Sequence, residues 1–157
     1  MTQKVFKKLV QNGLTIGFAE SMTGGFSAFQ MIKNPGASKV IKGSIIAYSD
    51  HEKVHLLGID PLLIQTLSSV SKEVSIEMAK SIQKLLGADI GVGITGNAGP
   101  AFQAGTQAHE AHIAIIYQQE IIHEQINLSK LSRFKSIRRT TQCVYEHLDR
   151  LLSQISR

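Results

Sequence analysis

The stretch Leu14-Thr-Ile-Gly-Phe-Ala-Glu-Ser-Met-Thr-Gly-Gly25 decides the fold. Its first six residues form a short apolar run, and residues 20–25 have the small and polar composition of a tight turn. After the turn, apolar residues recur at helical spacing at Phe26, Phe29 and Ile32. The stretch therefore predicts a strand, a tight turn and a helix in direct succession.

Strand and helix patterns alternate through the rest of the chain. Residues 40–48 and 89–95 contain apolar runs of strand length, and we expect the first of them to be a second buried strand. Residues 111–117 and 121–128 have the composition of two strands joined by a short turn, which predicts a hairpin. Helices are expected at residues 2–12 and 49–57, in a short segment after Asp60-Pro61, between a cap at Ser71 and a stop at Gly87, and at residues 132–153.

This alternation predicts an α/β fold, a three-layer α/β/α sandwich in which helices cover both faces of a mixed sheet. With 43% hydrophobic and 18% charged residues, residues 1–157 fit one compact domain. The lone Cys143 cannot form an internal disulfide. No apolar run reaches 18 residues, so we expect a cytoplasmic protein with no membrane partner.

The charge balance favours an anionic partner. The chain has 17 Lys and Arg residues against 12 Asp and Glu, a formal net charge of +5. Nucleic acid is a weak expectation because Trp is absent and only 6% of residues are aromatic, which leaves few rings for stacking bases. A small phosphorylated ligand fits the charge equally well. A basic group near the start of the last expected helix could clamp a phosphate or be a solvated surface; it comprises Lys130, Arg133, Lys135, Arg138 and Arg139.

Three loop segments are candidates for a ligand site, because ligands of such sheets bind beyond the carboxyl ends of the strands. They are residues 20–25, 48–53 and 95–100. In the first, Ser21 could be a nucleophile beside backbone amides, or Ser21 or Thr23 could merely cap the following helix. The third is rich in small residues that let backbone amides approach a ligand, and a plain turn is its alternative.

The second segment contributes an amine and a phenol. A buried Lys53 could serve as the general base for a serine with Tyr48 close by, or both could be ordinary partly solvated side chains. His51 and His55 lie four residues apart, which is the spacing of a metal pair, but no organised partners accompany them. We therefore expect no metal site there.

Four ordered segments of the chain carry a family resemblance. They are TIGFAESMTGG at residues 15–25, GSIIAYSDHEKVHLLG at 43–58, VSKEVSIEMA at 70–79 and ITGNAGP at 94–100. Together these segments resemble the CinA C-terminal domain family, whose stand-alone members include the nicotinamide-nucleotide amidases of bacteria. The resemblance covers most of the chain.

The resemblance implies deamidation of nicotinamide mononucleotide to nicotinic acid mononucleotide and ammonia, in pyridine nucleotide recycling, with no metal or other cofactor. It implies Ser21 as the nucleophile, Lys53 as its proton acceptor, and Tyr48 as a supporting hydrogen-bond donor. Thr95 would help to position the amide. The implied partners are the small-molecule nucleotide and further copies of the chain in a homodimer or larger homo-oligomer. By the same analogy the substrate-binding residues are Glu20, Thr23, Gly24, Gly25, Gly96, Asn97 and, for the phosphate, Arg138.

The chain also departs from the family pattern. After Pro100 the family usually continues with further glycines and a Lys-Pro-x-Gly-Thr-Val run, whereas residues 101–110 here are AFQAGTQAHE. Met22 stands where a cysteine is common, and Phe134 stands where an arginine usually precedes the Ile137-Arg138 pair by three residues. These departures support an alternative function, a catalytically impaired relative that binds a nucleotide or a protein partner.

Overall fold

The computed structural model of the protein describes residues 1–155 and contains a five-stranded mixed sheet. The sheet has the order β2-β1-β3-β4-β5. Strand β1 runs parallel to both β2 and β3, while β3–β4 and β4–β5 are antiparallel pairs. The strands are β1 (Ile16–Glu20), β2 (Ile41–Ile46), β3 (Ile90–Gly96), β4 (Glu110–Tyr117) and β5 (Glu120–Asn127).

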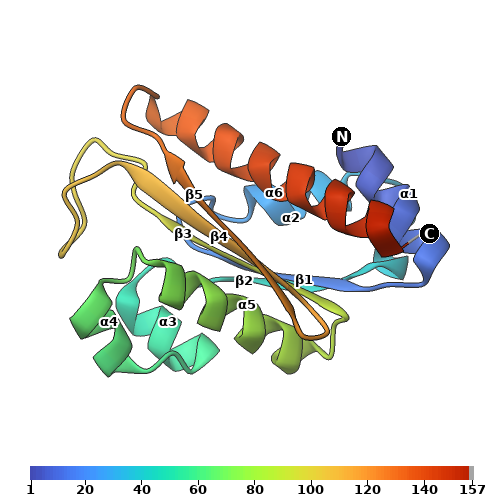
Figure 1. Ribbon diagram of the computed structural model, residues 1–157, viewed down its shortest axis with the longest axis horizontal. Coiled ribbons are helices and arrows are strands. Elements are labelled where there is room, and N and C mark those ends of the chain that lie inside the picture. The colour runs from blue at the N-terminus through green and yellow to red at the C-terminus, as the bar shows by residue number, and fades with distance from the viewer. Residues whose placement is uncertain (156–157) are drawn as a thin grey trace.

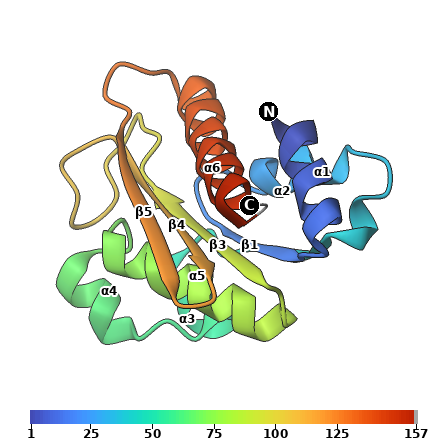
Figure 2. The ribbon, with the colours of Figure 1, turned by 45° about the vertical axis from the view of Figure 1, so that its right-hand side comes forward.

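Helices cover both faces of the sheet, which confirms the expected three-layer α/β/α fold (Figure 1). One face carries α1 (Thr2–Asn12), α2 (Phe26–Ile32) and α6 (Arg133–Ile155). The opposite face carries α3 (Asp50–Leu57), α4 (Pro61–Leu67) and α5 (Lys72–Leu86), and a 3-10 turn, η1 (Ala37–Lys39), precedes β2. Figure 2 shows α1 lying beside the long α6, where Lys4 and Lys8 pair with Asp149 at 2.8 and 2.5 Å.

Apolar side chains pack on both sides of the sheet. Residues of α1, α2 and α6 such as Leu9, Met31 and Leu148 pack against one face of the strands. On the other side Met78 and Ile82 of α5 form the second core with residues of β1 and the α3 region. Helices α1, α5 and α6 each bury one stripe, and the central strands β1, β3 and β4 bury both faces, as expected for a layered α/β protein.

Two glycines in β3 let α5 approach the sheet closely. A Cβ at Gly93 would lie 2.1 Å from the carbonyl oxygen of Ser75, and a Cβ at Gly91 would lie 2.1 Å from that of Ala79. Both distances are far below van der Waals contact, so a side chain at either position would push α5 away. This close packing fixes the position of β3 relative to α5. It thereby also positions the segment that follows Gly96.

Strand β2 differs from its prediction. Its residues alternate between half-buried and exposed, and Ile46 is 48% exposed, so the expectation of a second buried strand is wrong. The reason is topological, because β2 lies at the edge of the sheet and has only β1 as a neighbour. The hairpin prediction is confirmed, since β4 and β5 pair antiparallel across a tight turn.

Candidate active site

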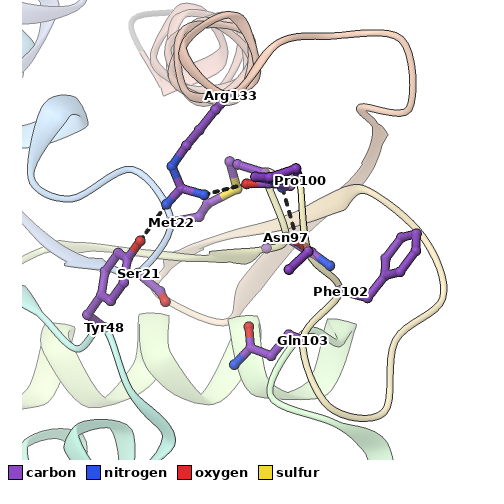
Figure 3. Close-up of a pocket in the computed structure, with 12 residues that line it drawn as sticks. Ser21, Met22, Tyr48, Asn97, Pro100, Phe102, Gln103 and Arg133 are labelled. Atoms are coloured by element: carbon purple, nitrogen blue, oxygen red, sulfur yellow. Dashed lines mark hydrogen bonds between the residues drawn. The ribbon is translucent and has the colours of Figure 1, made fainter.

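The structure brings residues from all three candidate loop segments to one end of the sheet. Ser21 directly follows β1, Asn97 directly follows β3, and Tyr48 follows β2 by two residues. They surround a cavity of about 320 Å³, shown in Figure 3. The residues that line it are Ser21, Met22, Tyr48, Gly96, Asn97, Ala98, Gly99, Pro100, Ala101, Phe102, Gln103 and Arg133.

Lys53 stands directly behind Ser21. The Ser49 hydroxyl caps α3 by accepting from the Glu52 amide at 3.1 Å, which places Lys53 one turn into the helix. The Lys53 side chain is fully buried (0% exposed), and its Nζ lies 3.2 Å from Ser21 Oγ. This is hydrogen-bond distance between a hydroxyl and an amine.

Burial sets the protonation of this amine. Removal from water disfavours the ammonium form and lowers the pKa of Lys53 from its usual 10.5, while the carboxylate of Asp50 opposes that shift. The Asp50 Oδ1 to Lys53 Nζ distance is 3.9 Å. A lysine amine with a lowered pKa beside a serine hydroxyl has the geometry of a nucleophile and its general base.

The turn after β1 presents Ser21 because Glu20 organises the helix start. The buried Glu20 carboxylate accepts four hydrogen bonds, from the Thr23 hydroxyl at 2.6 Å and the amides of Gly25, Ser27 and Ala28 at 3.1, 3.1 and 2.8 Å. A carboxylate at a helix N-terminus also meets the positive end of the helix dipole. Capping is thus performed by Glu20, and the Ser21 hydroxyl is left to meet Lys53.

The other residues of this turn that were predicted to bind substrate lie outside the cavity. Glu20, Thr23, Gly24 and Gly25 do not line the cavity, although they were expected to bind substrate. Gly25 has φ 90°, a left-handed conformation that glycine adopts without strain and that lets the chain enter α2. These residues therefore shape the turn that holds Ser21.

Thr95 and Asn97 both support the loop after β3. The buried Thr95 hydroxyl donates to the Ser69 carbonyl at 2.6 Å, and Thr95 does not line the cavity. Asn97 does line it, together with Gly96. Asn97 Oδ1 accepts from the Gly99 amide at 3.1 Å, so this side chain fixes the curve of the loop toward Pro100.

Arg133 is the cation that reaches the cavity. Its Nη2 donates to the Tyr48 hydroxyl at 2.5 Å and its Nη1 to the Gly99 carbonyl at 2.6 Å, as Figure 3 shows. Both acceptors are neutral, and within residues 1–155 no carboxylate forms an ion pair with Arg133. The sequence named Arg133 only as one member of a basic group. Its position as the first residue of α6, at the end of the helix that faces the loop, was the signal available.

Arg138 lies elsewhere. Its guanidinium sits 5.9 Å from the ring centre of Phe134, and it lines a separate surface hollow with residues of α1 and α2. The structure therefore does not bring Arg138 to Ser21, and Arg133 occupies the place expected for it.

The described residues contain neither a metal cluster nor a membrane span. Residues 1–155 hold no group of three or more His, Cys, Asp or Glu side chains arranged to bind a metal ion. His51 is 78% exposed and its ring stacks on that of His55. In the same part of the chain, every helix is too short or too polar to cross a bilayer.

Fold and site together define an α/β protein in which a serine faces a cavity at the carboxyl ends of parallel strands and a buried lysine stands behind it. The chain belongs to the CinA C-terminal domain family, whose model matches residues 1–152. This agrees with the resemblance carried by the four sequence segments.

Individual relatives agree with this membership. A CinA-like protein of Dictyoglomus turgidum is 36% identical over 134 residues, which is 82% of this chain and 32% of that protein. The chain spans between 24% and 37% of the length of this and other curated relatives that it matches.

Solved structures match over nearly their full length. A competence-damaged protein (CinA) superfamily protein from Klebsiella pneumoniae has a TM-score of 0.92 at 25% identity, with 98% of this chain and 96% of that chain covered. A competence or damage-inducible protein from Enterobacter asburiae has a TM-score of 0.86 at 28% identity, with 98% and 94% covered.

Proposed function

We propose that this protein is an amidohydrolase that converts nicotinamide mononucleotide to nicotinic acid mononucleotide and ammonia. The observation that carries the proposal is the contact between the fully buried Lys53 Nζ and Ser21 Oγ at 3.2 Å, at the wall of an open cavity. The choice of substrate rests on the family resemblance and on a cationic side chain at the same cavity.

The first half of the reaction forms an acyl-enzyme. The neutral Lys53 amine takes the proton of Ser21 as Oγ attacks the carboxamide carbon, and the carbonyl oxygen becomes an oxyanion. The Tyr48 hydroxyl accepts from Arg133, so its own O–H remains to donate to that oxyanion. Lys53 then passes its proton to the leaving nitrogen, the C–N bond breaks, and ammonia departs.

Water completes the turnover. Lys53, again neutral, takes a proton from the water that attacks the ester carbon, and it returns the proton to Ser21 Oγ as the acyl–oxygen bond breaks. The products are the free enzyme and nicotinic acid mononucleotide, whose new carboxylic acid loses its proton to solvent or to the released ammonia and becomes a carboxylate. One base therefore serves both halves of the reaction, and no metal or redox partner is needed to balance it.

Arg133 supplies the preference for a phosphorylated substrate. Within residues 1–155 its hydrogen-bond partners are the Tyr48 hydroxyl and the Gly99 carbonyl, and a phosphate is a stronger partner for a guanidinium than either neutral group. The formal net charge of +5 favours the same class of ligand.

A second function is favoured by one observation. Residues 101–103 lie in the segment where the chain departs from its family pattern, and they provide three of the twelve residues lining the cavity. A loop remodelled to this extent fits a relative that binds a nucleotide without turning it over.

Ammonia release separates the two functions. Purified protein is assayed with nicotinamide mononucleotide, nicotinamide riboside and free nicotinamide, and nucleotide binding is followed by calorimetry. The amidase account expects the mononucleotide to be the best substrate, because the riboside lacks the phosphate that Arg133 meets. Tight binding of the mononucleotide with no ammonia released, by protein whose circular dichroism is that of a folded α/β chain, would replace the amidase with the binding relative.

A further inference from the structure

Gln103 joins the remodelled loop to the segment behind the serine–lysine pair. Its Nε2 donates to Ser69 Oγ at 2.8 Å and to Asp50 Oδ1 at 3.3 Å. Figure 3 shows its amide reaching from the loop toward the Ser21 side of the cavity. A second tether runs beside it, from the Ser68 hydroxyl to the Ala104 carbonyl at 3.2 Å.

The oxygen that Gln103 holds is the same oxygen that faces the amine. Asp50 Oδ1 lies 3.9 Å from Lys53 Nζ, which is beyond hydrogen-bond distance. Asp50 and Lys53 stand three residues apart on α3, a spacing that allows direct contact between their side chains. The Asp50 side chain is 48% exposed and therefore has room to move. Its present position is explained by the bond from Gln103.

The other groups around Lys53 leave Asp50 as its electrostatic partner. From the turn after β1, the Glu20 carboxylate is engaged by the α2 amides and the Thr23 hydroxyl. From the loop after β2, Tyr48 is bonded to Arg133. Helix α5 turns apolar side chains such as Val74 and Met78 to this core, and α4 consists of uncharged residues.

We propose that Gln103 is a positioning residue that holds the Asp50 carboxylate away from Lys53, so that the amine stays free to accept the Ser21 proton. This inference rests on the proposed amidase function. It assigns a role to a residue in the segment where the chain departs from its family pattern.

Loss of the Gln103 amide has a calculable effect. Without it, Asp50 Oδ1 can close from 3.9 Å to the ~2.8 Å of a charge-assisted hydrogen bond with Lys53. At the effective dielectric constant of a protein site, this closer charge raises the pKa of Lys53 by about one unit. At a pH below the pKa of Lys53 in wild type, this rise lowers the neutral fraction of the amine about tenfold, and kcat/KM falls with it.

The titration of Lys53 is measured directly in protein labelled with carbon-13 at lysine Cε. The Lys53 resonance is assigned by its disappearance in Lys53→Met. Gln103→Met keeps the length of the side chain and loses its hydrogen bonds, and Gln103→Ala is the second variant. Ser68→Ala is the matched control, because it removes the other loop tether and leaves the bond between Gln103 and Asp50 intact.

The expected result is a Lys53 titration about one pH unit higher in Gln103→Met than in wild type, and unchanged in Ser68→Ala. Asp50→Asn removes the charge, so Asp50→Asn and the double variant Asp50→Asn/Gln103→Met should titrate together. An unchanged or lowered titration in folded Gln103→Met and Gln103→Ala overturns the inference. Because no substrate is needed, this outcome is independent of whether nicotinamide mononucleotide is turned over. The pH profile of kcat/KM, measured beside it, should move with the resonance.

Discussion

Replacement of Glu20 tests whether its carboxylate builds the turn that presents Ser21. The carboxylate is buried and accepts from three backbone amides and one hydroxyl at the start of α2. The family resemblance implied a substrate-binding role for Glu20 instead. The two roles predict different losses, one in stability and the other in KM.

The magnitude follows from how the four bonds divide between the two oxygens. Oε2 accepts three of them and Oε1 accepts only the Ala28 amide, at 2.8 Å. In Glu20→Gln the amide oxygen can keep the three bonds of Oε2, while the NH₂ group faces the Ala28 N–H. We therefore expect the free energy of unfolding to fall by about 2–3 kcal/mol. Glu20→Ala leaves all four donors without their acceptor, and we expect a loss of about 4–5 kcal/mol from a total stability on the order of 5–15 kcal/mol.

Urea unfolding at one fixed protein concentration measures these losses, and Glu120→Gln is the control because Glu120 is exposed at the start of β5. The control should stay within about 0.5 kcal/mol of wild type. The free energy of unfolding is predicted to be lowest for Glu20→Ala, intermediate for Glu20→Gln and highest for wild type. If Glu20→Ala unfolds within about 1 kcal/mol of wild type and mainly raises KM, the structural role is refuted and the carboxylate is a substrate ligand.

Four further predictions concern the site and the packing behind it. Arg133→Gln should raise KM for nicotinamide mononucleotide about 10- to 100-fold, whereas Arg138→Gln, its matched control, should leave KM near wild type in steady-state assays. Because burial lowers the pKa of Lys53, kcat/KM should rise with pH and level off with a midpoint below 10.5. In the window between that lowered pKa and 10.5 the unfolded chain binds more protons than the folded one, so stability should also rise with pH, and Lys53→Met should lack this slope in urea unfolding. Gly93→Ala should lower the free energy of unfolding by about 3 kcal/mol or more in the same assay, since its Cβ would lie 2.1 Å from the Ser75 carbonyl oxygen. A free energy of unfolding equal to that of wild type would contradict this packing.

The fold was predictable where local signals decide the structure. Helix α5 is an example, because the Ser71 hydroxyl caps it by accepting from the Val74 amide at 3.3 Å and Gly87 ends it at φ 57°. Both signals are visible in the sequence as residue types at set positions. The burial of β2 was not predictable in this way, since it depends on the order of strands in the sheet.

The site was predictable in part. The contact between Ser21 and Lys53 agrees with the roles that the family resemblance implied for them. Glu20 and Arg138 differ, because a residue type does not fix the direction of its side chain. The sequence does not show whether a glutamate after a strand contacts a ligand or the amides of the next helix. Nor does it show which arginine of the basic group on α6 reaches the cavity. Gln103 could not be predicted, since its partners come from two segments far away in the sequence.

Ammonia release by Ser21→Ala tests the central claim most directly. Initial rates with nicotinamide mononucleotide are compared for wild type, Ser21→Ala and Ser44→Ala, a control at an exposed serine of β2. The account predicts a loss of at least about 1,000-fold in kcat for Ser21→Ala, unchanged folding by circular dichroism, and wild-type rates for the control. A folded Ser21→Ala protein that releases ammonia at the wild-type rate would contradict the role of the serine–lysine pair.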